Sequence, residues 1–140
     1  MIEAVSAGAI IYRDKPGKRE YLLLKSRAGD WEFPKGGVEG NEELQQTAIR
    51  EVKEESGLSN FKLLDGFREE YHYFFQASGS TIHKTVHLFV AKSFDSKAGI
   101  SDEHSDLQWR DYAQAINTIN HDGPRGILEH ANQFLIDSGY

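Results

Sequence analysis

The sequence contains no cysteine, only three prolines and a single methionine. Without cysteine the chain can form neither a disulfide nor a thiolate metal site, which excludes disulfide-stapled scaffolds and cysteine-ligated zinc modules. No apolar run approaches the roughly 20 residues of a membrane-spanning helix. These absences favour an ordinary soluble globular protein.

The chain also lacks an excess of positive charge: 16 basic residues stand against 22 acidic ones, for a net charge of −6. This balance argues against a surface that coats long nucleic acid, although a local basic cleft stays compatible with it. The start, Met1-Ile2-Glu3, shows no charged-then-apolar leader, so no secretory signal is expected and a cytoplasmic location is the prediction. A length of 140 residues without a Pro/Gly/Ser-rich linker predicts one domain over residues 1–140.

Hydrophobic patterning predicts several strands, one internal helix and one closing helix. Strands are expected at Ala4–Tyr12 and Tyr21–Ser26, in the β-rich runs Phe61–Phe75 and Thr81–Phe94, and at Asp106–Arg110. Trp31–Glu39 reads as a loop and Gln76–Ser80 as a hairpin turn. This order is compatible with an α/β sandwich, but periodicity alone does not define the topology.

Helix-end residues bound the two predicted helices. Asn41 is the expected N-cap of the first helix and Gly57 its C′ residue. Pro124 fits the first turn of the closing helix. Apolar stripes for the core are Leu44, Ala48, Ile49 and Val52 in the first helix, and Ile127, Leu128, Ala131, Phe134 and Leu135 in the second.

The first helix carries the residues most suggestive of chemistry. Glu51, Glu54 and Glu55 stand at i, i+3 and i+4, so their side chains are expected to converge within one turn. Like charges at this spacing repel, and folding alone does not require them. A hard divalent cation takes oxygen ligands and is often shared between carboxylates and substrate phosphates. The pattern therefore predicts a metal site for phosphate chemistry; the alternative is a solvated acidic helix face.

Residues 36–58, GGVEGNEELQQTAIREVKEESGL, resemble the signature of the Nudix (MutT-like) pyrophosphohydrolases. The nine matching positions are Gly36, Glu42, Arg50, Glu51, Val52, Glu54, Glu55, Gly57 and Leu58. The resemblance implies a Nudix α/β/α sandwich with a mixed central β-sheet. It also implies that Glu51, Glu54, Glu55 and a backbone carbonyl near Gly36 hold Mg²⁺, with Mn²⁺ as an alternative. Arg50 is expected to orient a carboxylate, and Glu42 to be structural or peripheral.

Segments outside this signature resemble one branch of the family, the asymmetric diadenosine tetraphosphate hydrolases. They are Ser6–Arg13, Trp31–Gly37, Gly66–Tyr73, Lys84–Val86 and Ser101–His104 with Trp109, and they span nearly the whole chain. The resemblance implies substrate contacts by Trp31, Lys35, Tyr73 and Lys84, and makes Glu103 an extra metal ligand or a general base. Close relatives often have histidine where this chain has Gly37. A second adenine-holding aromatic has no clear counterpart, although His121 lies in that region.

Residue types in this region also suit a nucleotide. Tyr71, Tyr73 and Phe75 share one face of their strand, while His72 and Phe74 lie on the other. A base stacked on Tyr73 would gain roughly 1–3 kcal/mol, unless these aromatics simply fill the core. The ammonium groups of Lys35 and Lys84 could bind the non-reacting phosphates, although most surface lysines have no such role.

The expected reaction is metal-assisted hydrolysis of a phosphoanhydride, with in-line attack by water on phosphorus. The catalytic set comprises Glu55, Glu103, Glu54 and Arg50, and the sequence does not decide whether Glu55 or Glu103 accepts the proton. By resemblance, diadenosine tetraphosphate would give ATP and AMP. Other possibilities are sanitation of nucleoside triphosphates, removal of the 5′ pyrophosphate from RNA, or a non-catalytic nucleotide-sensing module. The expected partner is a small nucleotide or dinucleoside polyphosphate rather than a membrane or long nucleic acid, and the oligomeric state is not indicated.

Overall fold

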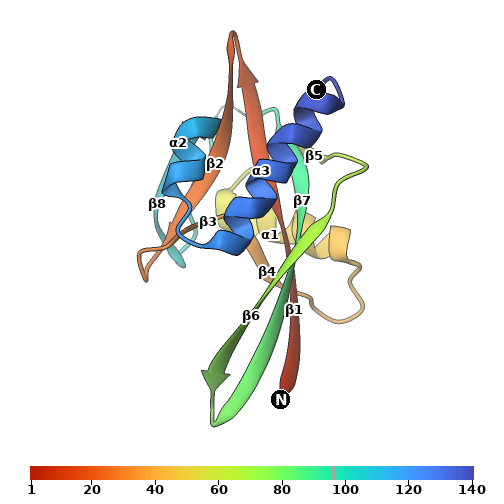
Figure 1. The fold of residues 1–140 in the computed structure, drawn as a ribbon, viewed down its shortest axis with the longest axis vertical. Coiled ribbons are helices and arrows are strands. Elements are labelled where there is room, and N and C mark those ends of the chain that lie inside the picture. The colour runs from red at the N-terminus through yellow and green to blue at the C-terminus, as the bar shows by residue number, and fades with distance from the viewer. Residues whose placement is uncertain (96) are drawn as a thin grey trace.

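The structure, a computed structural model, describes residues 1–95 and 97–140. Its elements in chain order are β1 (Ile2–Lys15), β2 (Lys18–Ser26), β3 (Trp31–Glu32), β4 (Lys35–Gly37), α1 (Leu44–Ser56), β5 (Phe61–Leu63), β6 (Glu69–Ala77), β7 (Ser80–Ser93), β8 (His104–Asp111), α2 (Tyr112–Thr118) and α3 (Asp122–Asp137). Figure 1 shows their arrangement.

The strands form one mixed sheet organised around β1 and β7, which run parallel from the pair Ile2–Ile82 to the pair Tyr12–Lys92. The other pairings are antiparallel: β2 and β4 pair with β1, β3 and β8 pair with β2, and β5 and β6 pair with different stretches of β7. The crossover from β1 to β7 lets segments distant in sequence meet at the centre of the sheet.

Helices cover both faces of the sheet: α1 lies on one face, and α2 and α3 lie on the other (Figure 1). Alternate residues of β1 accordingly join two separate cores. Ala7 and Ala9 belong to the same buried cluster as Val52 of α1, whereas Ile10 belongs to the cluster that contains Leu128 of α3. A strand buried on both faces reads as a continuous apolar run, as this one does. The predicted α/β/α sandwich with a mixed central sheet is confirmed.

Helix α1 begins two residues later than predicted. Its N-cap is Glu43, not Asn41: the Glu43 side chain accepts from the backbone of Gln46, and the Gln46 side chain accepts from the Glu43 N–H at 2.8 Å. This reciprocal capping box satisfies two backbone donors that a single Asn cap would not. Gly57 ends the helix in the left-handed conformation, with φ of 69°, as predicted.

Three other segments differ from the sequence-based expectation. The predicted loop 31–39 contains the short strands β3 and β4. The predicted run 61–75 is divided into β5 and β6 by residues 64–68, which place Leu64 and Phe67 in the core. Helix α2 was not predicted; it starts at Asp111, whose side chain accepts from the Gln114 N–H at 2.8 Å.

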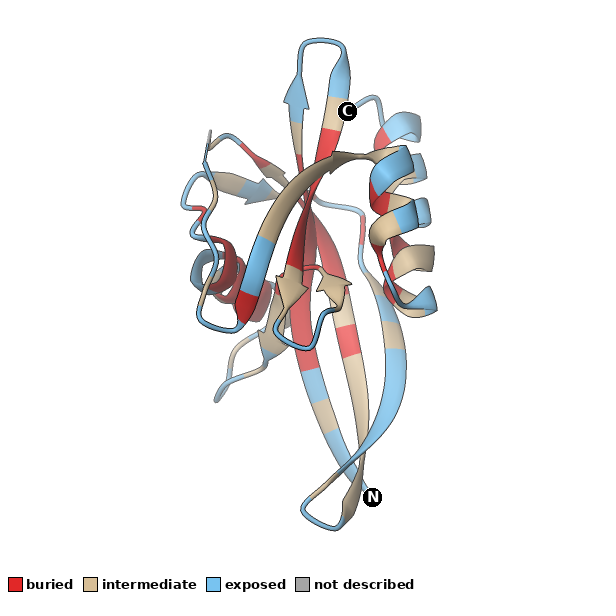
Figure 2. Cartoon of the chain, turned by 90° about the vertical axis from the view of Figure 1, so that its left-hand side faces the viewer, coloured by how far each residue is buried: buried red, intermediate tan, exposed pale blue. Residues whose placement is uncertain are grey.

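Part of the sheet extends beyond the helices as an arm, made of residues 2–5 of β1, 72–77 of β6 and 80–85 of β7 (Figures 1 and 2). Its tip is the predicted hairpin turn, and its surface is mostly exposed or half-buried. Within residues 1–95 and 97–140, no helix is both long enough and apolar enough to cross a bilayer.

Candidate active site

The acidic helix α1 meets the short strand β4 at Gly36. Pairing with Ala7 of β1 holds Gly36 in the sheet. A Cβ atom on Gly36 would collide with the carboxylate of Glu51, a residue that is only 9% exposed. Glycine is therefore required here because a buried carboxylate packs against its backbone.

Glu55 lies one turn further along α1 and is buried, with 6% of its surface exposed. Its carboxylate accepts a hydrogen bond from the Lys35 N–H at 3.1 Å. Burial, together with the neighbouring Glu103 and Glu51 carboxyl groups, raises the pKa of Glu55 to about 8, although the Lys35 hydrogen bond opposes this. The side chain thus resists ionisation until a positive charge compensates it.

Glu103 approaches this helix from the loop before β8. Its carboxyl group lies near enough to those of Glu55 and Glu51 to raise the pKa of both. Burial is the main reason that the pKa of Glu51 is raised, with Glu54 and Glu103 adding to it against the guanidinium of Arg50. The structure therefore brings Glu103 to the helix carboxylates although it lies about 50 positions away in the sequence.

Arg50 holds several acceptors in place. Its Nε and Nη2 donate to the two Glu42 carboxylate oxygens at 2.8 and 2.9 Å, and Nη2 also donates to the Gly37 carbonyl at 2.9 Å. Its Nη1 donates to Glu51 at 2.7 Å. This guanidinium lowers the pKa of Glu42 to about 2. The geometry suits the predicted orienting role for Arg50 and a structural role for Glu42.

Glu54 does not join the other two helix glutamates. Its side chain is 58% exposed, and Nη1 of Arg50 contacts it at 3.3 Å. Glu54 follows Glu51 by three residues and is therefore rotated partly away from the helix face that Glu51 and Glu55 share. The hydrogen bond from Arg50 also holds the Glu54 side chain in its exposed position. Of the three predicted carboxylates, Glu51 and Glu55 are therefore buried, while Glu54 is exposed and, like Glu103, acts on Glu51 by its charge.

His104 is a site residue that the sequence analysis did not single out. It is 2% exposed, its Nε2 donates to Glu32 at 3.1 Å, and its Nδ1 lies 3.2 Å from the Ser101 hydroxyl, which can donate to it. The same Nε2 lies 4.0 Å from Glu55. Its position directly after Glu103 was the available signal. A buried imidazole thus links Glu32 to the acidic centre.

A cavity of about 350 Å³ opens beside these carboxylates. Its lining residues are Asp30, Glu32, Lys35, Tyr71, His72, Tyr73, His121, Gly123 and Pro124. Two of them also touch the acidic centre: the Lys35 N–H binds Glu55, and Glu32 binds His104. The cavity and the carboxylate cluster are therefore parts of one continuous site.

The two predicted lysines lie near each other in this region. The charge of Lys35, after burial itself, is a cause of the lowered pKa of Lys84. Lys84 is the pairing partner of Tyr73 on the adjacent strand, and Lys35 approaches Glu32 at 3.9 Å. Two ammonium groups thus lie near each other, that of Lys84 on the residue paired with Tyr73 and that of Lys35 beside Glu32.

The predicted base platform lies at the cavity wall. Tyr73 is 38% exposed and stacks on Tyr71, with ring centroids 6.3 Å apart and planes 20° apart. Gly123 of α3 contacts the other ring, Tyr71, so closely that a Cβ there would lie 3.0 Å from it. Tyr73 thus lies between Tyr71 and Phe75, whose ring centroid is 5.9 Å from its own, and stays partly exposed.

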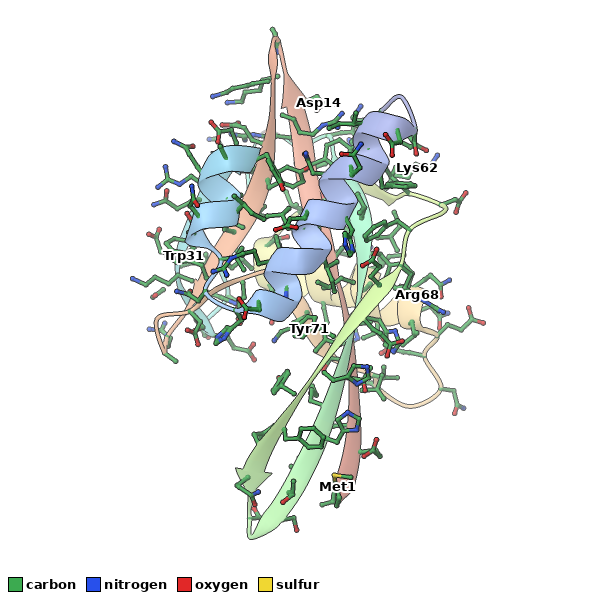
Figure 3. All side chains as sticks on the ribbon, in the orientation of Figure 1. Met1, Asp14, Trp31, Lys62, Arg68 and Tyr71 are labelled. Atoms are coloured by element: carbon green, nitrogen blue, oxygen red, sulfur yellow. The ribbon has the colours of Figure 1, made fainter. Side chains whose placement is uncertain are left out.

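Trp31 does not line this cavity among the described residues. It packs against the core cluster beneath α2 and α3, and its backbone N–H donates to the side-chain oxygen of Asn120 at 2.6 Å. In Figure 3 it lies toward α2, whereas Tyr71 lies by the start of α3. The substrate contact predicted for Trp31 stays a prediction, and its backbone hydrogen bond to Asn120 helps to fix the loop that carries Glu32 and Lys35.

The cluster was tested as a cation site by its donor chemistry. Glu51, Glu55 and Glu103 offer only oxygen donors. Burial first, and neighbouring carboxylates second, raise the pKa values of Glu51 and Glu55, and a bound divalent cation would offset both effects. In residues 1–95 and 97–140, however, no three His, Asp or Glu side chains are gathered tightly enough to chelate an ion without adjustment. The residue types fit Mg²⁺, and the side chains would have to move to bind it.

A family model described as NUDIX domain matches residues 3–131. The chain belongs to the Nudix family. It is 33% identical over 135 residues to the asymmetrical bis(5′-nucleosyl)-tetraphosphatase of Caenorhabditis elegans, covering 93% of this chain and 95% of that protein. The protein of the same name from Sus scrofa is 32% identical over 120 residues, covering 83% and 80%.

Structural similarity agrees with this assignment. The crystal structure of a C. elegans Ap4A hydrolase binary complex matches with a TM-score of 0.84 at 30% identity, over 98% of this chain and 99% of that one. This Nudix chain is a pyrophosphohydrolase, in a family that binds nucleotides and typically uses a divalent metal.

Proposed function

We propose that this Nudix hydrolase cleaves diadenosine tetraphosphate asymmetrically, giving ATP and AMP, with Mg²⁺ as its cofactor and Mn²⁺ as a substitute. The observation that carries the proposal is the continuity between the Tyr71–Tyr73 cavity wall and the buried carboxylates, made by Lys35 and Glu32. A base on the aromatic wall would leave its polyphosphate directed past the lysines toward the acidic centre. The names of the similar tetraphosphatases support the same substrate.

Glu51, Glu55 and Glu103 would hold the cation, with the backbone around Gly36 beside them. When bound, Mg²⁺ neutralises polyphosphate charge and acidifies the attacking water. Glu54 would become a further ligand only by releasing Arg50, which contacts it at 3.3 Å. Arg50 and Glu42 would keep Glu51 oriented from behind.

The hydrolytic step transfers one proton. A new oxygen–phosphorus bond forms on one side of the attacked phosphorus while the bridging bond on the other side breaks, and the departing phosphate keeps that electron pair. The proton lost by water goes to Glu55 or Glu103. Glu55 is buried beside the other carboxylates, whereas Glu103 is exposed to solvent and can pass the proton on to bulk water.

The lysines would decide where the chain of phosphates is cut. Lys84 is paired with Tyr73 of the base platform, and the charge of Lys35 acts on Lys84, while the Lys35 backbone N–H binds Glu55. If these two lysines bind the phosphates next to the bound nucleoside, the attacked phosphorus lies a fixed number of phosphates away from that nucleoside. A fixed distance from base to acidic centre predicts asymmetric cleavage, and a substrate with five phosphates should still release ATP.

The testing experiment is a substrate panel with Mg²⁺: diadenosine tetraphosphate and pentaphosphate, the nucleoside triphosphates and a 5′-triphosphorylated RNA, with products separated by chromatography. Diadenosine tetraphosphate should have the highest kcat/KM and give ATP and AMP. Fast hydrolysis of a nucleoside triphosphate without cleavage of dinucleoside polyphosphates would instead assign the protein to triphosphate sanitation.

Nucleotide binding without any turnover, in wild type and Glu55→Gln alike, would identify a sensing module.

A further inference from the structure

A second cluster of polar side chains lies on the arm, on the face opposite the base platform. His72 lies between Tyr71 and Tyr73 in sequence and contributes to the cavity lining, but strand alternation directs its imidazole to the side opposite the two tyrosine rings. There His72 meets His83 and Thr85 of β7, and the carboxylates of Glu70 and Glu3 lie at the two ends. None of these five residues belongs to the acidic centre.

The two imidazoles face each other edge to edge. Nδ1 of His72 lies 3.0 Å from Nε2 of His83. The ring planes are only 17° apart, yet the ring centroids are 5.1 Å apart, which is far more than the nitrogen–nitrogen distance. The closest approach is therefore between ring edges, and the two nitrogens point at one another rather than past one another.

The outer nitrogen of each ring touches a carboxylate. His72 Nε2 lies 2.8 Å from Glu70, and His83 Nδ1 lies 2.8 Å from Glu3. An ionised carboxylate only accepts hydrogen bonds, so each outer nitrogen carries the ring hydrogen. A neutral imidazole has only one such hydrogen, and both inner nitrogens are then left with lone pairs.

Two lone pairs facing each other at 3.0 Å require a cation between them or a hydrogen from elsewhere. The hydroxyl of Thr85, 3.1 Å from His72 Nδ1, has a single hydrogen and can satisfy only one of the two nitrogens. A carboxylate on the outer nitrogen is also how proteins orient a metal-binding histidine, with the inner nitrogen as the ligand.

We propose that His72 and His83 form a binding site for a divalent transition-metal ion of the kind that imidazole favours, represented by Zn²⁺. Two nitrogens at about 2 Å from one tetrahedral ion lie roughly 3.3 Å apart, so the observed pair needs to open by only a few tenths of an ångström. The His72 and His83 side chains are 46% and 21% exposed, so an ion can enter from solvent and water can complete its coordination. The bound ion should therefore exchange with solvent, unlike the ion of a closed structural site.

The site should be selective against the cation of the acidic centre. Mg²⁺ prefers oxygen ligands, whereas the arm offers two imidazole nitrogens. Because His72 belongs to β6 and His83 to β7, a shared ion would also fasten these two strands to each other. Amide hydrogen exchange in the arm should therefore slow when the ion binds.

The test is calorimetric titration of Zn²⁺ into the full chain with excess Mg²⁺ present to occupy the carboxylates. We expect one Zn²⁺ per chain, and at least tenfold weaker binding in His72→Ala and His83→Ala. Glu70→Gln and Glu3→Gln should weaken binding by about tenfold. The matched control is His130→Ala: His130 Nδ1 lies 2.6 Å from Glu69, so it has a carboxylate, but no facing imidazole among the described residues. It should bind Zn²⁺ as wild type does.

Imidazole ¹⁵N spectra provide a second readout, in which Zn²⁺ should shift Nδ1 of His72 and Nε2 of His83 and leave His130 unchanged. Thermal melts of each variant, with His83→Gln as a conservative alternative, separate loss of the site from loss of the fold. Absence of Zn²⁺ binding by the wild type would overturn the proposal. So would wild-type Zn²⁺ affinity in folded His72→Ala and His83→Ala proteins.

Discussion

Replacing Glu55 with glutamine should stabilise the metal-free protein while disabling the enzyme. Glutamine keeps an oxygen for the Lys35 N–H but removes a buried charge that Glu51 and Glu103 oppose. The pKa of Glu55 is raised to about 8 in the folded protein from an ordinary 4.5, so the folded state binds the proton more tightly than the unfolded state. Stability from this group is therefore complete below pH 4.5 and is lost as the pH rises toward 8.

The magnitude follows from this window. Each pH unit within it removes at most ~1.4 kcal/mol from the free energy of unfolding, so the loss reaches roughly 3 kcal/mol near pH 7. Glu55→Gln should lack this loss, so its free energy of unfolding should fall less as the pH rises. Its kcat should fall by about 10²-fold or more, as expected when a group that stabilises transition-state charge is removed.

Urea denaturation between pH 5 and 9 in EDTA, for wild type, Glu55→Gln and the exposed control Glu129→Gln, measures the effect directly. Wild type and the control should share one slope against pH, and Glu55→Gln should be flatter and more stable above pH 7. If all three proteins had the same slope, or if Glu55→Gln were the least stable at pH 8, the argument about crowded carboxylates would be refuted. A kcat within threefold of wild type would remove Glu55 from the catalytic set.

Three further substitutions probe the rest of the site. Tyr73→Ala should raise KM for diadenosine tetraphosphate roughly tenfold with little change in kcat, and Tyr73→Phe should retain stacking; unchanged KM with a large fall in Tm would make Tyr73 a packing residue. Arg50→Lys loses the paired hydrogen bonds to Glu42, so Tm should fall and Mg²⁺ should bind about tenfold more weakly in calorimetry; wild-type affinity would contradict the orienting role. Gly36→Ala should cost about 1–3 kcal/mol in urea denaturation and weaken Mg²⁺ binding, whereas Gly37→Ala, with open space around its Cβ, should do neither; equal effects would disprove the specific contact.

The resemblance to the Nudix signature predicted the layers, and apolar stripes on one face predicted both main helices. Strand β1 was visible as a continuous apolar run because it is buried on both faces. The sequence did not reveal features that depend on local competition. Asn41 has the right chemistry for an N-cap, but the reciprocal bonds of Glu43 and Gln46 place the helix start later. Helix α2 has only seven residues, too few for a periodic signal, and its cap at Asp111 becomes visible only in the structure.

The same division holds for the candidate site. The spacing of Glu51 and Glu55 was sufficient to place them on one helix face, because i, i+4 geometry is local. Spacing did not show that Arg50 would bind Glu54 instead of leaving it with the others, since the competing contact depends on the side-chain conformation. His104 was not predicted because its partner Glu32 is 72 residues away and is brought close only by the pairing of β8 and β3 with β2.

The most direct test of the proposed function is the hydrolysis of diadenosine tetraphosphate in ¹⁸O-labelled water with Mg²⁺, followed by mass spectrometry of the separated nucleotides. If Lys35 and Lys84 hold the phosphates next to the bound nucleoside and the carboxylates mark the attacked phosphorus, the products should be ATP and AMP in equal amounts. The label should enter only one of them, which we expect to be AMP. Two molecules of ADP as the main product, or label divided between ATP and AMP, would contradict cleavage at a fixed number of phosphates from the nucleoside bound at the aromatic wall.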